Sequence, residues 1–435
     1  SATGGYEISN SLRFNEGDSP TLNITFGSEG SKRTMTFSFW LKRSNFGDEV
    51  YSLYSAGADA NNRDQIRFLD ESLDIIFQRN DTTYYRLRTN RLFRDPSAWY
   101  HIVVAIDTTD GTSSNRIKLY VNGVQESSFA TSDYPTQNLD LYFNDDIAQT
   151  IGRYSQSDSD HWDGHIADFY FIDGTQYAAS NFGETDDNGV WIPKEFAGTF
   201  GSNGYFLEFQ QTGTSANASG KGADTSGNGN HWDDNGMTAE DITVDTPTNN
   251  FATVNPLTET QGVIDFSEGN TQIAGNTTTQ GSARSSIQIP PSGKWYIESE
   301  FDAIGGSGNN AFGIVTESYT SHSIDASGGR GVKASYSGGA SSRVIQIMNG
   351  SSQIGSNINV SSGIIMQLAV DQDNGKAWLG KDDTYYNSSG GTDGNPANGS
   401  NPTFTFTAEN FDVLFGAYKG GGGDAIQRQK VNFGN

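Results

Sequence analysis

The feature that most constrains the fold is alternation of apolar and polar residues in short runs, which recur roughly every ten to twenty residues with turn-formers between them. Clear examples are Thr34–Leu41 and Lys294–Phe301, and Trp99–Asp107 is the most strand-like run of the first half. Side chains of a strand point alternately to its two faces, whereas an amphipathic helix repeats with a longer period, which is nearly absent here. The 52 glycines of this 435-residue chain supply frequent turns. The sequence therefore predicts an all-β protein built of two antiparallel β-sandwich domains.

The domain organisation follows from where this alternation stops. Residues 211–256 are polar and rich in Gly, Asn and Thr, and a second β-rich stretch starts near Gly262. We therefore predict a first domain over residues 1–235, a linker over 236–261 and a second domain over 262–435. Within the first domain, Asn122-Gly123 between two apolar runs predicts a type I′ hairpin.

Charge and cysteine content limit the partners. The formal net charge is −25, which argues against binding to nucleic acid or to anionic membranes. No apolar run has the length of a membrane-spanning helix, so membrane insertion is not expected. The chain has no cysteine, so a metal site could use only histidine and oxygen ligands.

The stretch H-W-D-G-H, residues 161–165, raises the question of a metalloprotease site. In zinc proteases two histidines four residues apart share one face of a helix. Here Gly164 interrupts the spacing and a strand pattern follows, so we predict a turn that enters a strand, with zinc binding as the alternative. The predicted strand places its residues on two faces: Ile166, Asp168, Tyr170 and Ile172 on one, and Ala167, Phe169, Phe171 and Asp173 on the other.

No catalytic residues are predicted. Retaining glycosidases need two carboxylates about 5–5.5 Å apart. The first domain lacks a complete carboxylate pattern of this kind. Glu298, Glu300 and Asp302 do alternate on one strand of the second domain, but such a face is expected to meet solvent or a loop. We therefore expect a protein without enzymatic activity.

Calcium is the one cofactor that the sequence suggests. Two polar loops of the first domain are rich in the hard oxygen ligands that Ca²⁺ prefers. The candidate ligands are Asp158, Asp160, Asp163, Asp224, Asn228 and Asp233. Neither loop has the spacing of an EF-hand, and Asp and Asn are also ordinary turn-formers, so a purely structural role is the alternative.

Sugar-binding sites combine an aromatic face with amide, carboxylate or guanidinium groups. Candidate aromatic residues are Trp162, Tyr154 and Trp232 near the rim of the first domain, and Tyr385 and Tyr386 in a loop of the second. The alternative for each is a packing role in the core.

The order of several motifs points to known families. T-F-S-F-W-L-K (36–42), I-K-L-Y-V-N-G (117–123) and I-G-R (151–153) resemble the laminin-G-like, concanavalin-A-like jelly rolls, over roughly residues 8–235. In the second half, S-G-K-W-Y-I-E (292–298) and M-Q-L-A-V-D-Q-D-N-G-K-A-W-L (366–379) resemble SPRY-type sandwiches. The resemblance implies a jelly roll followed by a SPRY-like sandwich.

The pairing of these domains through D-T-S-G-N-G-N-x-W and D-T-P-T-N-N-F-A-T-x-N-P-L is similar to virion proteins of tailed bacteriophages, especially marine ones. This resemblance implies a protein made in the host cytoplasm and displayed on the virion surface, as a tail-fibre-like or appendage component. Its partners would be other virion proteins and a host surface glycan, and self-association stays open. The alternatives are a capsid decoration or head-fibre protein, and a secreted glycan-active enzyme or bacterial adhesin.

Overall fold

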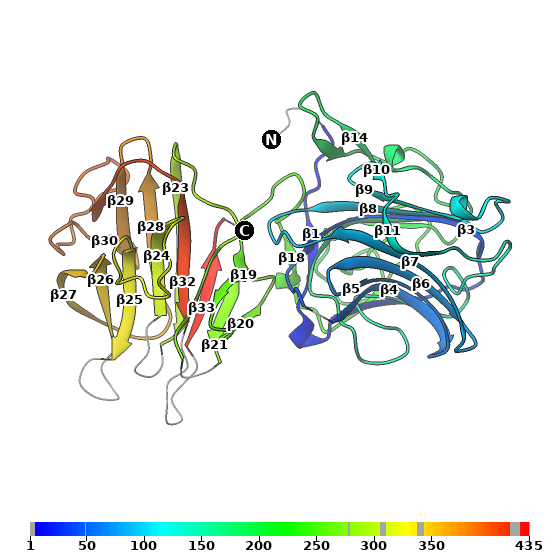
Figure 1. Ribbon diagram of the computed structural model, residues 1–435, viewed down its shortest axis with the longest axis horizontal. Helices are drawn as coiled ribbons and strands as arrows, with labels where there is room; N and C mark the ends of the chain where they lie inside the picture. Colours follow the sequence, from blue (N-terminus) through cyan, green and yellow to red (C-terminus); the bar gives the residue numbers. More distant parts are fainter. Residues whose placement is uncertain are drawn as a thin grey trace. The chain divides into compact units, whose positions relative to one another are not determined.

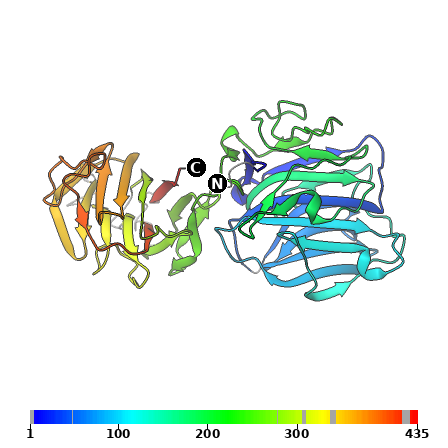
Figure 2. The ribbon, with the colours of Figure 1, turned by 90° about the horizontal axis from the view of Figure 1, so that it is seen from above.

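A computed structural model describes residues 5–47, 49–276, 279–304, 310–336, 343–417 and 427–434. The chain forms two compact units, Ser1–Asn250 and Phe251–Asn435 (Figure 1). All pairings between named strands are antiparallel in the described ranges, and each unit is a two-layered sandwich (Figures 1 and 2). The predicted all-β fold is therefore confirmed. No helix in the described ranges has the length and apolarity needed to cross a membrane.

The first unit consists of two sheets, a small hairpin and single 3-10 turns. Sheet A runs in the order β10 (Val124–Gln125), β9 (Ile117–Val121), β8 (Tyr100–Asp107), β3 (Thr34–Arg43), β13 (Gly164–Asp173), β1 (Ser11–Phe14) and β18 (Ile242–Thr243), and β16 (Tyr205–Leu207) also pairs with β13. Sheet B runs in the order β11 (Phe129–Asp133), β7 (Thr83–Leu92), β6 (Ser72–Arg79), β5 (Asn62–Leu69), β4 (Val50–Asp59), β12 (Ala148–Ile151), β2 (Thr21–Thr25) and β17 (Asp233–Asn235). The hairpin is β14 (Gly183–Thr185) with β15 (Trp191–Pro193), and the turns are η1 (Glu16–Asp18), η2 (Ser113–Asn115), η3 (Ala179–Asn181) and η4 (Ala239–Asp241).

The core of this unit lies between the two sheets. Phe37 and Phe39 of β3 face Ile75 and Phe77 of β6 there, and all four are buried. Sheet A also buries residues on its opposite face, where a second apolar cluster includes Tyr170 of β13. The central strands of sheet A are therefore covered on both faces, which explains the apolar residues at both parities of their sequences.

One detail of β13 differs from the prediction. Ile166 lies in the core between the sheets, whereas Tyr170 lies on the opposite face, so the predicted common face is wrong. The reason is a β-bulge: two residues, Asp168 and Phe169, lie opposite Phe39, and Asp168 has a left-handed backbone with φ of 44°. An extra residue in a strand turns every later side chain of that strand to the opposite face of the sheet. The predicted turn into a strand at Gly164 is confirmed.

The Asn122-Gly123 hairpin is also confirmed. Both residues have positive φ, 47° and 80°, as a type I′ turn requires, and Val121 pairs with Val124 across it.

The predicted linker, residues 236–261, carries secondary structure on both sides of the division between the units. Residues 239–243 form η4 and β18 of the first unit, and Val254–Thr260 is the first strand of the second. Between them, Asp245 is fixed to the first unit by Lys42 Nζ at 2.8 Å and by Trp99 Nε1 at 3.1 Å. Side-chain hydrogen bonds, rather than an apolar face, hold this stretch, so its sequence shows no alternation.

The second unit again has two sheets. Sheet C runs in the order β19 (Val254–Thr260), β22 (Gly281–Ser285), β32 (Phe411–Ala417), β24 (Asn310–Thr316), β25 (Arg330–Tyr336), β26 (Arg343–Asn349) and β27 (Ser352–Val360). Sheet D runs in the order β20 (Ile264–Ser267), β21 (Gln272–Gly275), β33 (Arg428–Asn432), β23 (Lys294–Ala303), β28 (Ile364–Asp371), β29 (Lys376–Lys381) and β30 (Thr384–Tyr385), and β31 (Phe404–Thr405) also pairs with β29. Phe312 and Phe415 of sheet C pack with Phe301 and Met366 of sheet D in the core.

Candidate functional site

Most aromatic residues predicted to bind sugar are buried. Trp162 and Trp232 are at most 1% exposed and belong to the core of the first unit. Tyr386 is 5% exposed, and Tyr154 is 7% exposed beneath the Arg63 guanidinium. A sugar needs a free ring face, so these four predictions are wrong: the rings fill the interior at strand ends. Tyr385 is partly exposed and remains a candidate.

The predicted calcium ligands Asp224 and Asn228 of the second loop are occupied by hydrogen bonds within the loop and to residues 201–206. The Asp224 carboxylate accepts hydrogen bonds from the backbone N–H groups of Phe206, Ser226 and Asn230, at 2.8–3.0 Å. The Asn228 amide donates to two backbone carbonyls. These contacts fit the alternative of a structural turn.

The remaining predicted ligands do not converge. Asp158 pairs with Arg153 at 2.9 Å, Asp233 is exposed on β17, and burial raises the pKa of Asp160. Asp163 is buried. Across the described ranges, no group of three or more His, Asp or Glu side chains is arranged to hold a metal ion. The residues therefore do not fit a calcium site.

The two histidines of H-W-D-G-H have different surroundings. His161 Nε2 lies 3.2 Å from an oxygen of Asp158, whereas His165 packs edge-on against Trp99. Burial lowers the pKa of His165 to about 3, so its imidazole is neutral at pH 7. The arrangement is that of a packed strand entry.

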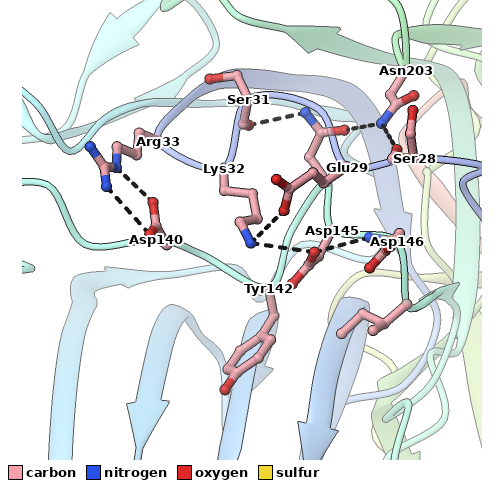
Figure 3. A network of polar contacts seen from close by, with 12 residues as sticks. Ser28, Glu29, Ser31, Lys32, Arg33, Asp140, Tyr142, Asp145, Asp146 and Asn203 are labelled. Carbon is pink, nitrogen blue, oxygen red and sulfur yellow. Dashed lines mark hydrogen bonds and ion pairs between the residues drawn. The ribbon is translucent and has the colours of Figure 1, made fainter.

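The acidic side chains at the rim of the first unit are partly neutralised by neighbouring basic residues (Figure 3). The Lys32 ammonium lies 2.8 Å from Glu29 and 3.5 Å from Asp145, and hydrogen bonding to Glu29 raises the pKa of Lys32. Beside it, Arg33 pairs with Asp140 at 2.6 Å. The Lys32 ammonium and the Arg33 guanidinium thus already occupy the positions beside these carboxylates that a metal cation would need.

A cavity of about 350 Å³ opens on the outer face of sheet A. Three aromatic residues, Tyr6, Trp40 and Trp191, line it together with the acids Glu7 and Asp186. We call this cavity the aromatic pocket. Its walls come from the N-terminal segment, β3, the β14–β15 hairpin and residues 247–250.

Two glycines seat the Trp191 ring. A Cβ atom at Gly123 would lie 2.3 Å from the ring, and one at Gly183 would lie 2.5 Å from it. Both distances are shorter than van der Waals contact allows, so only glycine fits at either position. The Asn122-Gly123 turn therefore closes a hairpin and also makes room for a pocket residue.

His101 holds the Trp191 ring in place through a hydrogen bond. Trp191 Nε1 donates to His101 Nδ1 at 3.0 Å, and the imidazole stacks on Trp40 with 4.8 Å between ring centroids. Burial lowers the pKa of His101 to about 3, so at pH 7 the neutral ring carries its proton on Nε2 and donates it to Ser38 Oγ at 2.9 Å. A serine nucleophile activated by histidine would donate its proton to the imidazole, which is the opposite direction. The Ser38–His101 pair therefore holds Trp191 in place at the pocket rather than acting as a nucleophile and its base.

Asp186 supplies an ionised acceptor at the pocket. Its Oδ1 accepts hydrogen bonds from the backbone N–H groups of Val190 at 2.8 Å and Asn188 at 2.9 Å. The bond from Val190 is the largest cause of a lowered pKa for this carboxyl. The carboxylate is therefore charged at neutral pH.

Tyr6 connects the pocket to the bulge in β13. Its side chain hydrogen-bonds to Asp168, which is 3% exposed. Burial raises the pKa of Asp168 to about 8, so this acid is mostly protonated at pH 7. Because Asp168 is mostly neutral, the acids that carry negative charge at the pocket are Glu7 and Asp186.

Sequence reasoning missed every residue of the aromatic pocket. The segments that form it lie far apart in the chain, and no spacing rule joins them. The available signal was weak: Trp191 follows a D-D-N-G turn that no core pattern explains.

Comparisons with known proteins agree with the observed sandwich. Residues 16–180 match the family model of the concanavalin A-like lectin/glucanases superfamily, Laminin_G_3. The first unit therefore contains a laminin-G/concanavalin A-like domain, as its motifs predicted. No curated protein matches the chain in sequence.

Three solved structures illustrate the likeness in fold. The SAP-like pentraxin of Limulus polyphemus is 16% identical with a TM-score of 0.29, covering 40% of this chain and 80% of its own. The SPRY domain of human HERC1 is 14% identical with a TM-score of 0.27, covering 41% and 96%. Mouse laminin α1 domains LG4-5 are 11% identical with a TM-score of 0.33, covering 99% and 89%. Likenesses at this level carry no functional argument.

Proposed function

We propose that this chain is a glycan-binding protein without catalytic activity, and that the aromatic pocket of its first unit holds the sugar. The observation that carries the proposal is the pocket itself: Trp191, Trp40 and Tyr6 line one cavity with the carboxylates Glu7 and Asp186. Aromatic rings stack on the apolar face of a pyranose, and carboxylates accept hydrogen bonds from its hydroxyls.

The size and charge of the pocket limit which sugars can bind in it. Its volume of about 350 Å³ is near the lower end of the range for small-molecule sites, about 300–1,000 Å³, which suits a terminal sugar rather than a long chain. The ionised Asp186 disfavours a negatively charged sugar. The proposed ligand is therefore a neutral or amino sugar at the end of a glycan.

The test is binding of the full chain to immobilised neutral, amino and acidic oligosaccharides. Trp191→Leu keeps apolar bulk but removes the aromatic face, and we expect it to weaken binding by about tenfold or more. Val190→Ala is the matched control, because Val190 lines the same pocket and is 55% exposed but has no ring. Equal binding by wild type and Trp191→Leu would refute the proposal.

A glycan-active enzyme is the second candidate, and one observation favours it: two carboxylates, Glu7 and Asp186, line the same cavity. Glycosidases use such a pair. The discriminating assay incubates the chain with each bound glycan and measures new reducing ends. Release that Glu7→Gln abolishes would make the protein an enzyme; binding without release supports the non-catalytic proposal.

The biological setting that we propose is the surface of a phage virion, with other virion proteins and a host glycan as partners. Support comes from the resemblance of the paired domain motifs alone. A fixed copy number in purified particles would support it, and imaging of those particles would separate a tail appendage from a capsid decoration protein. Absence from particles would favour a bacterial adhesin.

A further inference from the structure

We propose that the outer face of sheet D in the second unit is a separate binding surface for a neutral polysaccharide. We call it the tyrosine platform and define it by Tyr296, Glu298, Gln367, Asp383 and Tyr385. It goes beyond the function proposed above, because it shares no residue with the aromatic pocket.

The strand register brings these residues together. Glu298 of β23 lies opposite Gln367 of β28, Gln367 lies opposite Gly380 of β29, and Gly380 lies opposite Tyr385 of β30. Tyr296 precedes Glu298 by two residues and so lies on the same face. Four neighbouring strands thus contribute one continuous row.

A hydrogen-bond network fixes the orientation of the platform. Gln367 Nε2 donates to the Tyr296 hydroxyl at 2.8 Å and to Asp383 Oδ1 at 2.7 Å, and its Oε1 accepts from the Asp383 backbone N–H at 2.7 Å. The Tyr296 hydroxyl donates to Glu298 at 2.5 Å. The Tyr385 side chain also hydrogen-bonds to Tyr296. Binding would therefore cost little ordering of these side chains.

Gly380 lets the Tyr385 ring lie on the sheet. A Cβ at this position would be 2.9 Å from the ring and 3.1 Å from Gln367 Oε1. The glycine is therefore required by the close approach of Tyr385 to the strand backbone.

The platform is accessible and has the chemistry of a sugar site. Tyr296 is 47% exposed although its hydroxyl already has hydrogen-bond partners, so part of its ring is free for stacking. Glu298 and Asp383 are acceptors for sugar hydroxyls beside that ring.

Charge selects a neutral ligand. Besides Glu298 and Asp383, the same face carries Glu300, with Lys430 at 3.7 Å, and the exposed Lys294, so its acidic charge is only partly compensated. The chain as a whole has a formal charge of −25. A polyanion would be repelled, whereas an uncharged, hydroxyl-rich chain would meet both acceptors and aromatic rings.

The experiment measures binding of the full chain to four immobilised polysaccharides: a neutral glucan, a neutral mannan, a neutral galactan and the polyanion alginate. Trp191→Leu is the background, so that the contribution of the aromatic pocket is reduced by about tenfold or more. We expect residual binding to at least one neutral polysaccharide, none to alginate, and about tenfold weaker binding after Tyr296→Ala or Tyr385→Ala. Tyr296→Phe keeps the ring and should lose less.

Trp295→Ala is the matched control. Trp295 is the neighbouring residue and is similarly exposed, at 43%, but it has the opposite strand parity. Its substitution should leave binding unchanged. Each variant is checked by its thermal unfolding.

The outcomes separate the two proposals. Absence of neutral-polysaccharide binding in the Trp191→Leu background, or binding indifferent to both tyrosine substitutions, overturns the platform alone. A second outcome is that Trp191→Leu alone does not change binding, whereas substitution of Tyr296 weakens it. This outcome overturns the proposal for the aromatic pocket and supports the tyrosine platform. If the tyrosine platform instead binds a second copy of this chain or another protein, the chain would associate with that protein without sugar, and the association would depend on the two tyrosines. This outcome also overturns the inference.

Discussion

Replacing Asp168 by asparagine should stabilise the first unit at neutral pH. Asp168 is 3% exposed, and burial raises the pKa of its carboxyl to about 8. With an unfolded-state pKa of about 3.9, holding this proton in the native state at pH 7 costs about 4 kcal/mol relative to acid conditions. Asparagine has the same shape, can accept the Tyr6 hydrogen bond and tolerates the left-handed backbone at φ of 44°. It removes the titration.

The sign follows from proton linkage. Between about pH 3.9 and 8 the native state binds this proton and the unfolded state does not, so wild-type stability falls as pH rises, by about 1.4 kcal/mol per pH unit. The variant lacks this slope. Its advantage over wild type should therefore grow from below about 1 kcal/mol at pH 4 to about 4 kcal/mol at pH 7.

The assay is guanidinium unfolding of the full chain from pH 4 to 8, followed by tryptophan fluorescence. Five of the seven tryptophans lie in the first unit, so the signal reports mainly on it. Asp81→Asn is the matched control, because Asp81 also has a positive φ of 61° but is exposed. A stability difference between wild type and Asp168→Asn that does not change with pH would refute the reasoning.

Three further predictions concern the first unit. In the Asp168→Asn background, the free energy of unfolding should rise with pH between about 3 and 6.5. Burial lowers the pKa of His101 and His165 to about 3, so in this pH range only the unfolded state binds protons on these histidines. A free energy of unfolding that does not change over this range would contradict the prediction. Asp245→Asn should destabilise the unit by about 3–5 kcal/mol, since it leaves a buried Lys42 ammonium without its carboxylate; a loss below about 1 kcal/mol in the same unfolding assay would show that residues 242–250 are not anchored there. Gly183→Ala should displace the Trp191 ring and weaken glycan binding by about tenfold without unfolding the chain, and unchanged affinity would contradict the seating of that ring.

The sequence predicts strands well where their apolar residues face a core. Thr34–Leu41 and Ile364–Val370 show clear alternation and correspond to β3 and β28. The edge strand β27, Ser352–Val360, is harder to recognise, because only Ile354, Ile358 and Val360 pack partly against the core and its other residues are exposed and polar or glycine. The bulge at Asp168 was equally hidden, since an inserted residue leaves the apolar composition of a strand unchanged.

The candidate sites were harder to predict. Exposure cannot be read from residue type, so Trp162 and Trp232 resembled rim residues although both fill the core. Asp224 resembled a metal ligand, but its carboxylate is used by backbone N–H groups of its own loop and of Phe206. The aromatic pocket depends on contacts between segments that are distant in sequence, such as Trp191 with His101.

The most direct test of the central claim is a crystal structure of the full chain with a bound neutral oligosaccharide. We predict that a terminal sugar ring lies in the aromatic pocket, stacked on Trp191, with a hydroxyl within hydrogen-bond distance of Asp186. A glycan bound only elsewhere on the first unit, with the pocket filled by solvent, would contradict the account.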